Sequence, residues 1–142
     1  MNYYFDTSAL IKNYIEEKGS DIVTELLIKT DSVVVSEITL LEGFSALRRI
    51  LLEELISKNN YTAVKNELKE DFEYFTIIEV EQAVPECERL IDIYQLKTLD
   101  SIQLSSALYN KNQIDGFICC DNRLIEAAQK ENLKVINPAK IS

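Results

Sequence analysis

Short apolar segments alternate with helical segments along the whole chain, and this alternation limits the possible folds more than any other feature of the sequence. Five runs are rich in β-branched and aromatic residues and have the length of strands. They are Tyr3–Phe5, Ser32–Val35, Phe75–Val80, Gly116–Cys120 and Lys134–Ile136. Strands that alternate with helices form βαβ units with right-handed crossovers, which build a parallel sheet covered on both faces. The sequence therefore predicts an α/β fold with a five-stranded parallel sheet.

The segments between these strands have the apolar period of amphipathic helices. The longest runs from Glu37 to about Ser57, and a helix over about Tyr61–Asp71 would return along it as a hairpin. The other predicted helices are Ser8–Tyr14, Ser20–Lys29, Glu86–Gln95, Asp100–Asn110 and Asn122–Glu131. The chain has 142 residues, 46% of them apolar, and no linker or repeat, so we expect a single domain over residues 1–142.

The composition excludes several kinds of chemistry. The chain has no histidine, which excludes Ser-His-Asp and Cys-His catalysis and most zinc sites. Its 24 acidic and 15 basic residues give a net charge of −9, which argues against a protein that binds nucleic acid through a basic surface alone. Carboxylate chemistry with a hard metal ion is the remaining expectation.

The cysteines and the apolar segments indicate where the protein works. Cys87, Cys119 and Cys120 are odd in number and lack a C-x-x-C spacing, so we expect core residues rather than a disulfide framework or a redox site. The N-terminal segment lacks the basic and apolar regions of a signal peptide, and no apolar run is long enough to span a membrane. We therefore expect a cytoplasmic protein without membrane contact.

Two aspartates directly follow predicted strands. Asp6 comes after the first strand and Asp121 after the fourth. The carboxyl ends of parallel strands meet at one edge of the sheet, where such folds bind ligands. Aspartate is also a favoured helix N-cap, and a capping carboxylate keeps acceptor capacity for a ligand. Both roles are therefore open for Asp6 and Asp121.

Two further acids lie in predicted helices near the same edge. Asp100 opens a helix, where the helix dipole favours an acid for structural reasons alone. Glu42 lies in the front half of the longest helix, where a solvated helix face or an ion pair with Arg49 would also explain it. Gly43 costs about 1 kcal/mol relative to alanine inside a helix, which indicates close approach of a ligand or of another helix.

Each acid has a structural explanation when taken alone, but the four together predict a metal site. Carboxylates that converge repel one another unless a cation lies among them. Mg²⁺ and Mn²⁺ prefer oxygen ligands, and in proteins they bind a few carboxylates together with water and substrate phosphate. Such a site activates a water molecule and stabilises charge on a phosphoryl group.

Four segments of the chain resemble the motifs of PIN-domain ribonucleases, of the kind found as VapC toxins in toxin–antitoxin pairs. In chain order they are Phe5–Lys12, Ser36–Glu42, Leu99–Leu108 and Cys120–Ala128. They occur in the order of the family and extend over almost the whole chain. One departure is that the family often has threonine and a larger residue where this chain has Cys119 and Cys120.

The resemblance implies a sheet of order 3-2-1-4-5 and endonucleolytic cleavage of RNA that depends on Mg²⁺ or Mn²⁺ and leaves 5′-phosphate and 3′-hydroxyl ends. It implies a homodimer held inactive by a small antitoxin protein. The implied catalytic and metal-binding residues are Asp6, Glu42, Asp100 and Asp121, with Thr7, Ser8 and Asn122 as accessory residues. Leu40, Phe44 and the Leu47–Leu55 face would line a groove for the antitoxin or belong to the core.

Three other interpretations are open to test. A receiver domain would need a lysine after the fifth strand, where this chain has Asn137-Pro138, and a phosphatase of the haloacid dehalogenase type would need a second acid at Ser8. The sequence disfavours both. The third alternative is a PIN-like fold without catalytic activity that binds RNA or protein, and the complete set of four acids argues against it.

Overall fold

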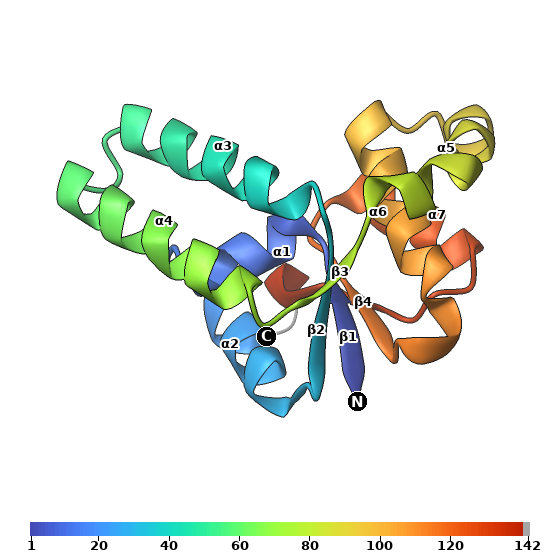
Figure 1. Cartoon of the computed structure of the whole chain (residues 1–142), viewed down its shortest axis with the longest axis horizontal. Coiled ribbons are helices and arrows are strands. Elements are labelled where there is room, and N and C mark those ends of the chain that lie inside the picture. Colours follow the sequence, from blue (N-terminus) through green and yellow to red (C-terminus); the bar gives the residue numbers. More distant parts are fainter. Residues whose placement is uncertain (141–142) are drawn as a thin grey trace.

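A five-stranded parallel sheet forms the centre of the computed structural model, which describes residues 1–140 (Figure 1). The strands are β1 (Asn2–Phe5), β2 (Ser32–Ser36), β3 (Thr76–Ile78), β4 (Gly116–Ile118) and β5 (Val135–Ile136). Their order is β3-β2-β1-β4-β5, and every neighbouring pair is parallel. This confirms the α/β class and the sheet order. The last two residues of the domain predicted over 1–142 lie outside the described residues.

Helices connect consecutive strands and cover the sheet. They are α1 (Thr7–Leu10), α2 (Ser20–Lys29), α3 (Thr39–Leu52), α4 (Lys58–Phe72), α5 (Val80–Tyr94), α6 (Thr98–Tyr109) and α7 (Asn122–Lys130). Short 3₁₀ helices span Ile11–Asn13, Lys111–Gln113 and Pro138–Lys140. Within residues 1–140, none of these helices has the length and apolar character needed to cross a lipid bilayer.

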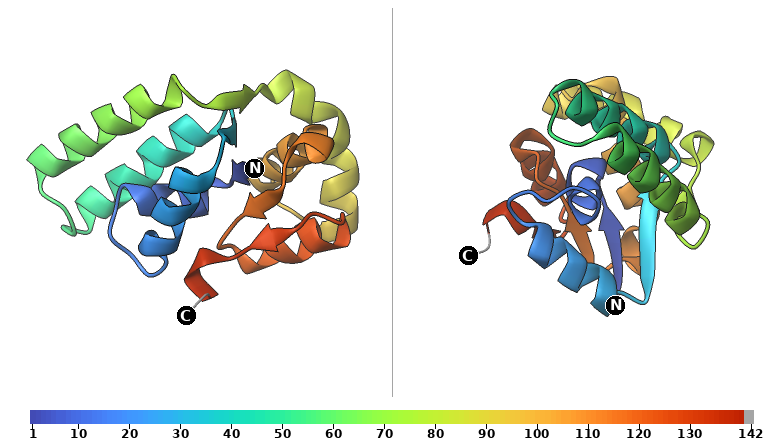
Figure 2. Two further views of the ribbon diagram at one scale, coloured as in Figure 1. Left: turned by 90° about the horizontal axis from the view of Figure 1, so that it is seen from below. Right: turned by 90° about the vertical axis from the view of Figure 1, so that its left-hand side faces the viewer.

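Alternating side chains of the strands build two cores, one on each face of the sheet. Tyr4 and Phe117 point to the face covered by α5, α6 and α7, and their rings lie 5.4 Å apart. Phe5 and Ile118 point to the other face, which α1 to α4 cover. Figure 2 shows the two layers of helices on either side of the strands. The apolar strand sequences follow from this double burial, since a parallel sheet has no solvated face.

Helices α3 and α4 form a hairpin that projects from the sheet (Figure 1). A Cβ atom at Gly43 would lie 2.8 Å from Cδ2 of the buried Leu68 in α4. The missing side chain therefore permits the close approach of another helix, one of the two uses expected for this glycine. Helix α3 ends at Leu52, before the predicted Ser57, because Glu54 adopts a left-handed conformation with φ of 59°.

The region around Pro85 differs most from the sequence prediction. A strand over Phe75–Val80 and a helix from Glu86 were expected, but β3 is shorter and α5 begins at Val80, with Pro85 inside it. Glu79 is extended and caps the helix, and its backbone N–H donates to the Gln82 side chain at 2.8 Å. The residue before a proline usually avoids helical geometry, and here this well-formed N-terminus outweighs that preference.

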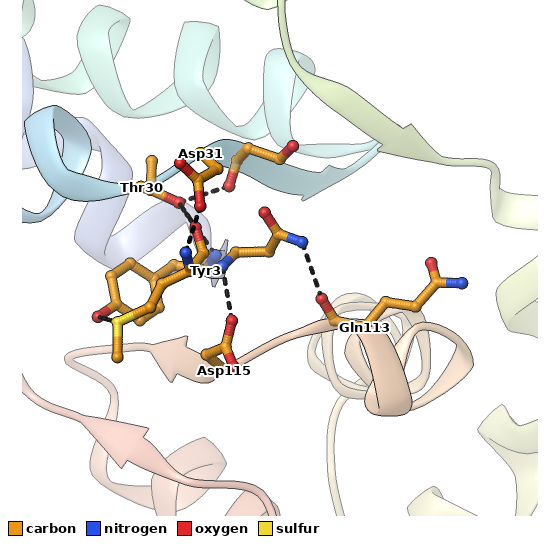
Figure 3. Close-up of polar contacts among 8 residues, drawn as sticks. Tyr3, Thr30, Asp31, Gln113 and Asp115 are labelled. Atoms are coloured by element: carbon orange, nitrogen blue, oxygen red, sulfur yellow. Dashed lines mark hydrogen bonds and ion pairs between the residues drawn. The ribbon is translucent and has the colours of Figure 1, made fainter.

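The amino ends of the strands are held together by polar side chains (Figure 3). Asp115 accepts a hydrogen bond of 2.8 Å from the backbone N–H of Asn2, and Thr30 accepts one of 3.2 Å from that of Tyr3. Asp31 pairs with the amino group of Met1. These two aspartates therefore stabilise the sheet at the end opposite to the carboxyl ends of the strands.

Candidate active site

A pocket of about 540 Å³ lies at the carboxyl edge of the sheet, between the α3 end of one layer and the α6 end of the other. The four acids predicted from the sequence line this pocket. Its lining residues are Asp6, Thr7, Ser8, Ile11, Ile38, Leu41, Glu42, Ser45, Ala46, Arg49, Leu99, Asp100 and Asp121. Residues that are far apart in the sequence thus share one concave, strongly acidic surface.

Asp6 is the most buried of the four acids, with 5% of its surface exposed. It follows β1 and is the N-cap of α1, and its Oδ2 accepts hydrogen bonds from Ser8 N at 3.2 Å and Ser8 Oγ at 2.6 Å. The Sγ of Cys119 donates to the same oxygen at 3.5 Å, and burial raises the pKa of this thiol. All three donors hold one oxygen, so Oδ1 has no protein donor among residues 1–140.

Glu42 lies in the first turn of α3, two turns before Arg49 on the same helix. Its Oε1 accepts hydrogen bonds from Thr7 Oγ1 at 2.8 Å and from Gln103 Nε2 at 2.7 Å. It forms no ion pair with Arg49 in the described chain, so that structural explanation of Glu42 is wrong. As in Asp6, one oxygen is held by the protein and the other is left without a protein donor.

Asp100 and Asp121 complete the acidic lining from the other side of the sheet. Asp121 is the N-cap of α7, and its Oδ1 accepts from Leu124 N at 3.1 Å. It follows β4 after Cys119 and Cys120, because the strand ends at Ile118 and not at Cys120 as expected. Asp100 lies in the first turn of α6 and accepts no hydrogen bond from the rest of residues 1–140.

The electrostatics of the pocket are those of crowded carboxylates. Burial, and next the negative charge of Glu42, raise the pKa of Asp6 to about 6 against the hydrogen bonds from Ser8. Burial, and next the charges of Asp121 and Glu42, raise the pKa of Asp100. All four acids cap a helix or lie in its first turn, where the helix dipole favours negative charge. The pKa values of Asp6 and Asp100 are nevertheless raised, so the helix dipoles do not cancel the effects of burial and of the neighbouring negative charges.

Of the three accessory residues predicted from the sequence, two line the pocket and one lies outside it. Thr7 and Ser8 each donate a hydrogen bond to an acid of the pocket, Thr7 to Glu42 and Ser8 to Asp6. Asn122 is exposed at the start of α7 and borders a separate depression beside Asn137 and Lys140. The structure therefore brings Thr7 and Ser8 to the acids and leaves Asn122 outside the pocket lining.

The family model described as PIN domain matches residues 3–134. The chain belongs to the PIN domain family. This confirms the family resemblance seen in the four sequence motifs. A comparison with curated proteins found no match.

Several solved structures share the fold of this chain. One is a toxin–antitoxin complex from Klebsiella pneumoniae, with a TM-score of 0.69, 18% identity, and coverage of 98% of this chain and 99% of that chain. VapBC2 from Rickettsia felis, bound to a promoter DNA fragment, has a TM-score of 0.66 and 16% identity. The match covers 96% of this chain and 98% of that chain. FitAcB from Neisseria gonorrhoeae has a TM-score of 0.66 and 13% identity, with coverage of 98% of this chain and 99% of that chain. At these identities the likeness is one of fold.

Two polar residues of this PIN domain site were missed by the sequence analysis. Gln103 is 1% exposed in α6 and donates to Glu42, and Arg49 lines the pocket as its one basic side chain among the residues described. The available signal for Gln103 was a glutamine between Ile102 and Leu104, in a run whose other side chains are apolar or small. Arg49 was considered only as a partner of Glu42.

The pocket of the PIN domain suits a hard divalent cation. Asp6 and Glu42 each have one oxygen held by the protein and one free, and all the acidic donors are oxygen atoms. In residues 1–140 no three acidic or sulfur side chains are close enough to enclose an ion by themselves. Mg²⁺ does not require that, because it binds one or two carboxylates and keeps several waters.

Proposed function

We propose that the protein is a metal-dependent endoribonuclease and the toxin component of a toxin–antitoxin pair. The observation that carries this proposal is the convergence of four carboxylates on one pocket at the carboxyl edge of a PIN domain sheet. The chain has no histidine, so a hydrolase of this kind needs a metal ion rather than an imidazole for its chemistry. The proposed reaction is hydrolysis of an RNA phosphodiester bond that leaves 5′-phosphate and 3′-hydroxyl ends.

In this proposal Asp6, Glu42, Asp100 and Asp121 hold Mg²⁺ or Mn²⁺. The ion supplies an activated water and stabilises negative charge on the phosphoryl group. Asp6, whose pKa is about 6, is mostly ionised at neutral pH and would offer its charge to a cation without first losing a proton. Ser8 and Thr7 keep the two inner carboxylates in place, since each donates to the oxygen that does not serve the ion.

The test is cleavage of an RNA panel with Mg²⁺, with Mn²⁺ and with a chelator, together with metal titration by calorimetry. We expect cleavage only with added metal, 5′-phosphorylated products, and metal binding at millimolar or lower concentration. Cleavage that continues in the chelator would refute the metal-dependent mechanism. A wild-type protein that binds RNA, binds no metal and cleaves no RNA would favour the noncatalytic binding module.

Arg49 is the proposed contact to the RNA backbone. It lies seven residues after Glu42, about 10 Å along the helix at 1.5 Å per residue, and forms no ion pair in the described chain. A guanidinium that lines the same pocket as the acids suits a phosphate that neighbours the cleaved one.

Replacing Arg49 should therefore weaken substrate binding more than the chemical step. For Arg49→Gln we expect a raised KM for RNA and a salt dependence of binding reduced by about 0.7 in the log–log slope, the value for one phosphate contact to a single strand. Arg48→Gln is the matched control, because Arg48 is the next residue and does not line the pocket. Equal changes in both variants would show a general charge effect instead.

A small antitoxin is the proposed protein partner. Leu41 and Leu99 flank the acids and are 69% and 48% exposed. A segment with apolar side chains and a lysine or arginine would match this surface. Of the groove residues expected from the sequence, Leu47 is fully buried and Leu40 and Phe44 pack against the same core, so these three belong to the core. The apolar part of the pocket lining includes Ile38, Leu41 and Leu99 instead.

The homodimer remains a proposal that rests on the family resemblance. Val84 and Ile93 in α5 and Tyr109 in α6 are more than half exposed, which gives apolar area for a second copy of the chain. Light scattering on the purified protein would measure its oligomeric state.

A further inference from the structure

We propose that Gln103 is a positioning residue that orients Glu42 in the pocket, and that Tyr4 fixes the orientation of Gln103. This inference rests on the proposed function, because it assigns the side chains that keep a proposed metal ligand in place. It extends the site from the pocket surface into the buried interface between β1, α3 and α6. None of the four sequence motifs had pointed to Tyr4.

The amide of Gln103 is buried, and its nitrogen donates to side chains at the site. Its Nε2 donates to Glu42 Oε1 at 2.7 Å, with Thr39 Oγ1 at 3.0 Å and Thr7 Oγ1 at 3.1 Å as further acceptors. Thr7 also donates to Glu42 Oε1, so one carboxylate oxygen receives two protein donors. Both donors are neutral, and they stabilise the ionised carboxylate without competing with a cation for its charge.

Tyr4 holds the oxygen end of the amide in the orientation that directs its nitrogen to Glu42. Its hydroxyl donates to Gln103 Oε1 at 2.6 Å from a fully buried ring in the central strand. A phenol is protonated near neutral pH, so its hydroxyl carries the proton for this hydrogen bond. The amide oxygen must therefore face Tyr4 and the amide nitrogen must face Glu42, because a flipped amide would place its oxygen against a carboxylate.

A purely structural role does not account for this glutamine. Residues Ser101 to Ala107 of α6 are all buried, and an apolar side chain at position 103 would avoid the cost of burying an amide. The partners of Gln103 come from three separate elements, and two of them, Thr7 and Glu42, line the pocket. With Oε1 held from this side, Oε2 of Glu42 is the oxygen left for a ligand.

The test compares Gln103→Leu, Tyr4→Phe and the control Ser105→Ala by metal calorimetry, RNA cleavage and thermal unfolding. Ser105 is also buried in α6, but its hydroxyl donates to Ala83 O, away from the pocket. For Gln103→Leu we expect metal affinity and cleavage to fall by about 10- to 100-fold, the effect of losing a partner that orients a metal ligand. Tyr4→Phe should give a smaller loss of the same kind, and Ser105→Ala should change unfolding only.

Wild-type metal affinity in a folded Gln103→Leu variant would overturn the inference, as would equal metal effects in Ser105→Ala. Should Gln103→Leu fail to fold, the same comparison is made with Tyr4→Phe, which keeps the amide and removes only the hydroxyl. A readout independent of metal is hydrogen exchange of the Gln103 side-chain amide by NMR, which Tyr4→Phe should accelerate.

The NMR measurement separates this inference from the proposed function. If the wild-type protein binds no metal and cuts no RNA, the proposed function fails. In that event, accelerated amide exchange in Tyr4→Phe still supports the orientation of Gln103 by Tyr4, and unchanged exchange refutes it.

Discussion

Asp100→Asn is expected to reduce metal-dependent RNA cleavage by more than about 100-fold, since loss of even an indirect partner of a metal costs up to that much. The stability of the protein should not fall. Asp100 accepts no hydrogen bond within residues 1–140, and burial, followed by the charges of Asp121 and Glu42, raises its pKa. Its charge therefore disfavours the metal-free folded state, and a neutral side chain of the same shape removes that repulsion.

The two measurements for Asp100→Asn are the initial rate of RNA cleavage and the unfolding midpoint in a chelator. Asp92→Asn is the matched control, because Asp92 is an exposed helical aspartate outside the pocket lining. We expect wild-type activity from Asp92→Asn and an equal or higher midpoint from Asp100→Asn. A folded Asp100→Asn protein with wild-type activity would remove Asp100 from the proposed site.

Metal-free protein should become less stable as the pH rises from about 4 to 7, and Asp6 should account for most of the difference from an Asp6→Asn variant. Below pH 3.8, Asp6 is protonated in the folded and unfolded chain alike. Between 3.8 and about 6 only the folded chain keeps the proton, so stability falls as the pH rises. Above about pH 6 the folded chain holds a buried charge, at a cost of about 3 kcal/mol at 1.36 kcal/mol per pH unit.

Denaturant unfolding at several pH values, in a chelator, measures this difference. Between pH 4 and pH 7, the free energy of unfolding of Asp6→Asn should rise by about 3 kcal/mol relative to that of the wild-type protein. Millimolar Mg²⁺ at pH 7 should stabilise the wild-type protein and not Asp6→Asn, because a ligand stabilises the state that binds it. Parallel stability curves for the two proteins would show that Asp6 ionises in the folded chain as easily as in the unfolded one.

The acids of the pocket could be predicted because their positions follow from local sequence. Asp6 and Asp121 stand between a strand and a helix, and the structure shows that both cap the helix that follows while lining the pocket. The capping role and the proposed functional role are therefore compatible, as one oxygen of each carboxylate accepts from the backbone. Asp100 and Glu42 likewise lie in the first turns of their helices.

The contacts around Gln103 could not be predicted in this way. Its partners Tyr4, Thr39 and Glu42 are 99, 64 and 61 residues away, and no local pattern relates them. The start of α5 was missed for a different reason. Pro85 is a strong local signal against a helix, and the capping residue that outweighs it, Glu79, lies inside the segment predicted as a strand.

The position of β1 between β2 and β4 has a consequence for how the protein is made. The first strand to leave the ribosome is the centre of the sheet, and β4 pairs with it only after residue 116. Asp121 reaches the pocket on the connection that follows β4, so a growing chain carries an incomplete set of acids until most of it has been translated. The pocket of the proposed nuclease would therefore receive its fourth acid only when the segment after β4 has joined the sheet.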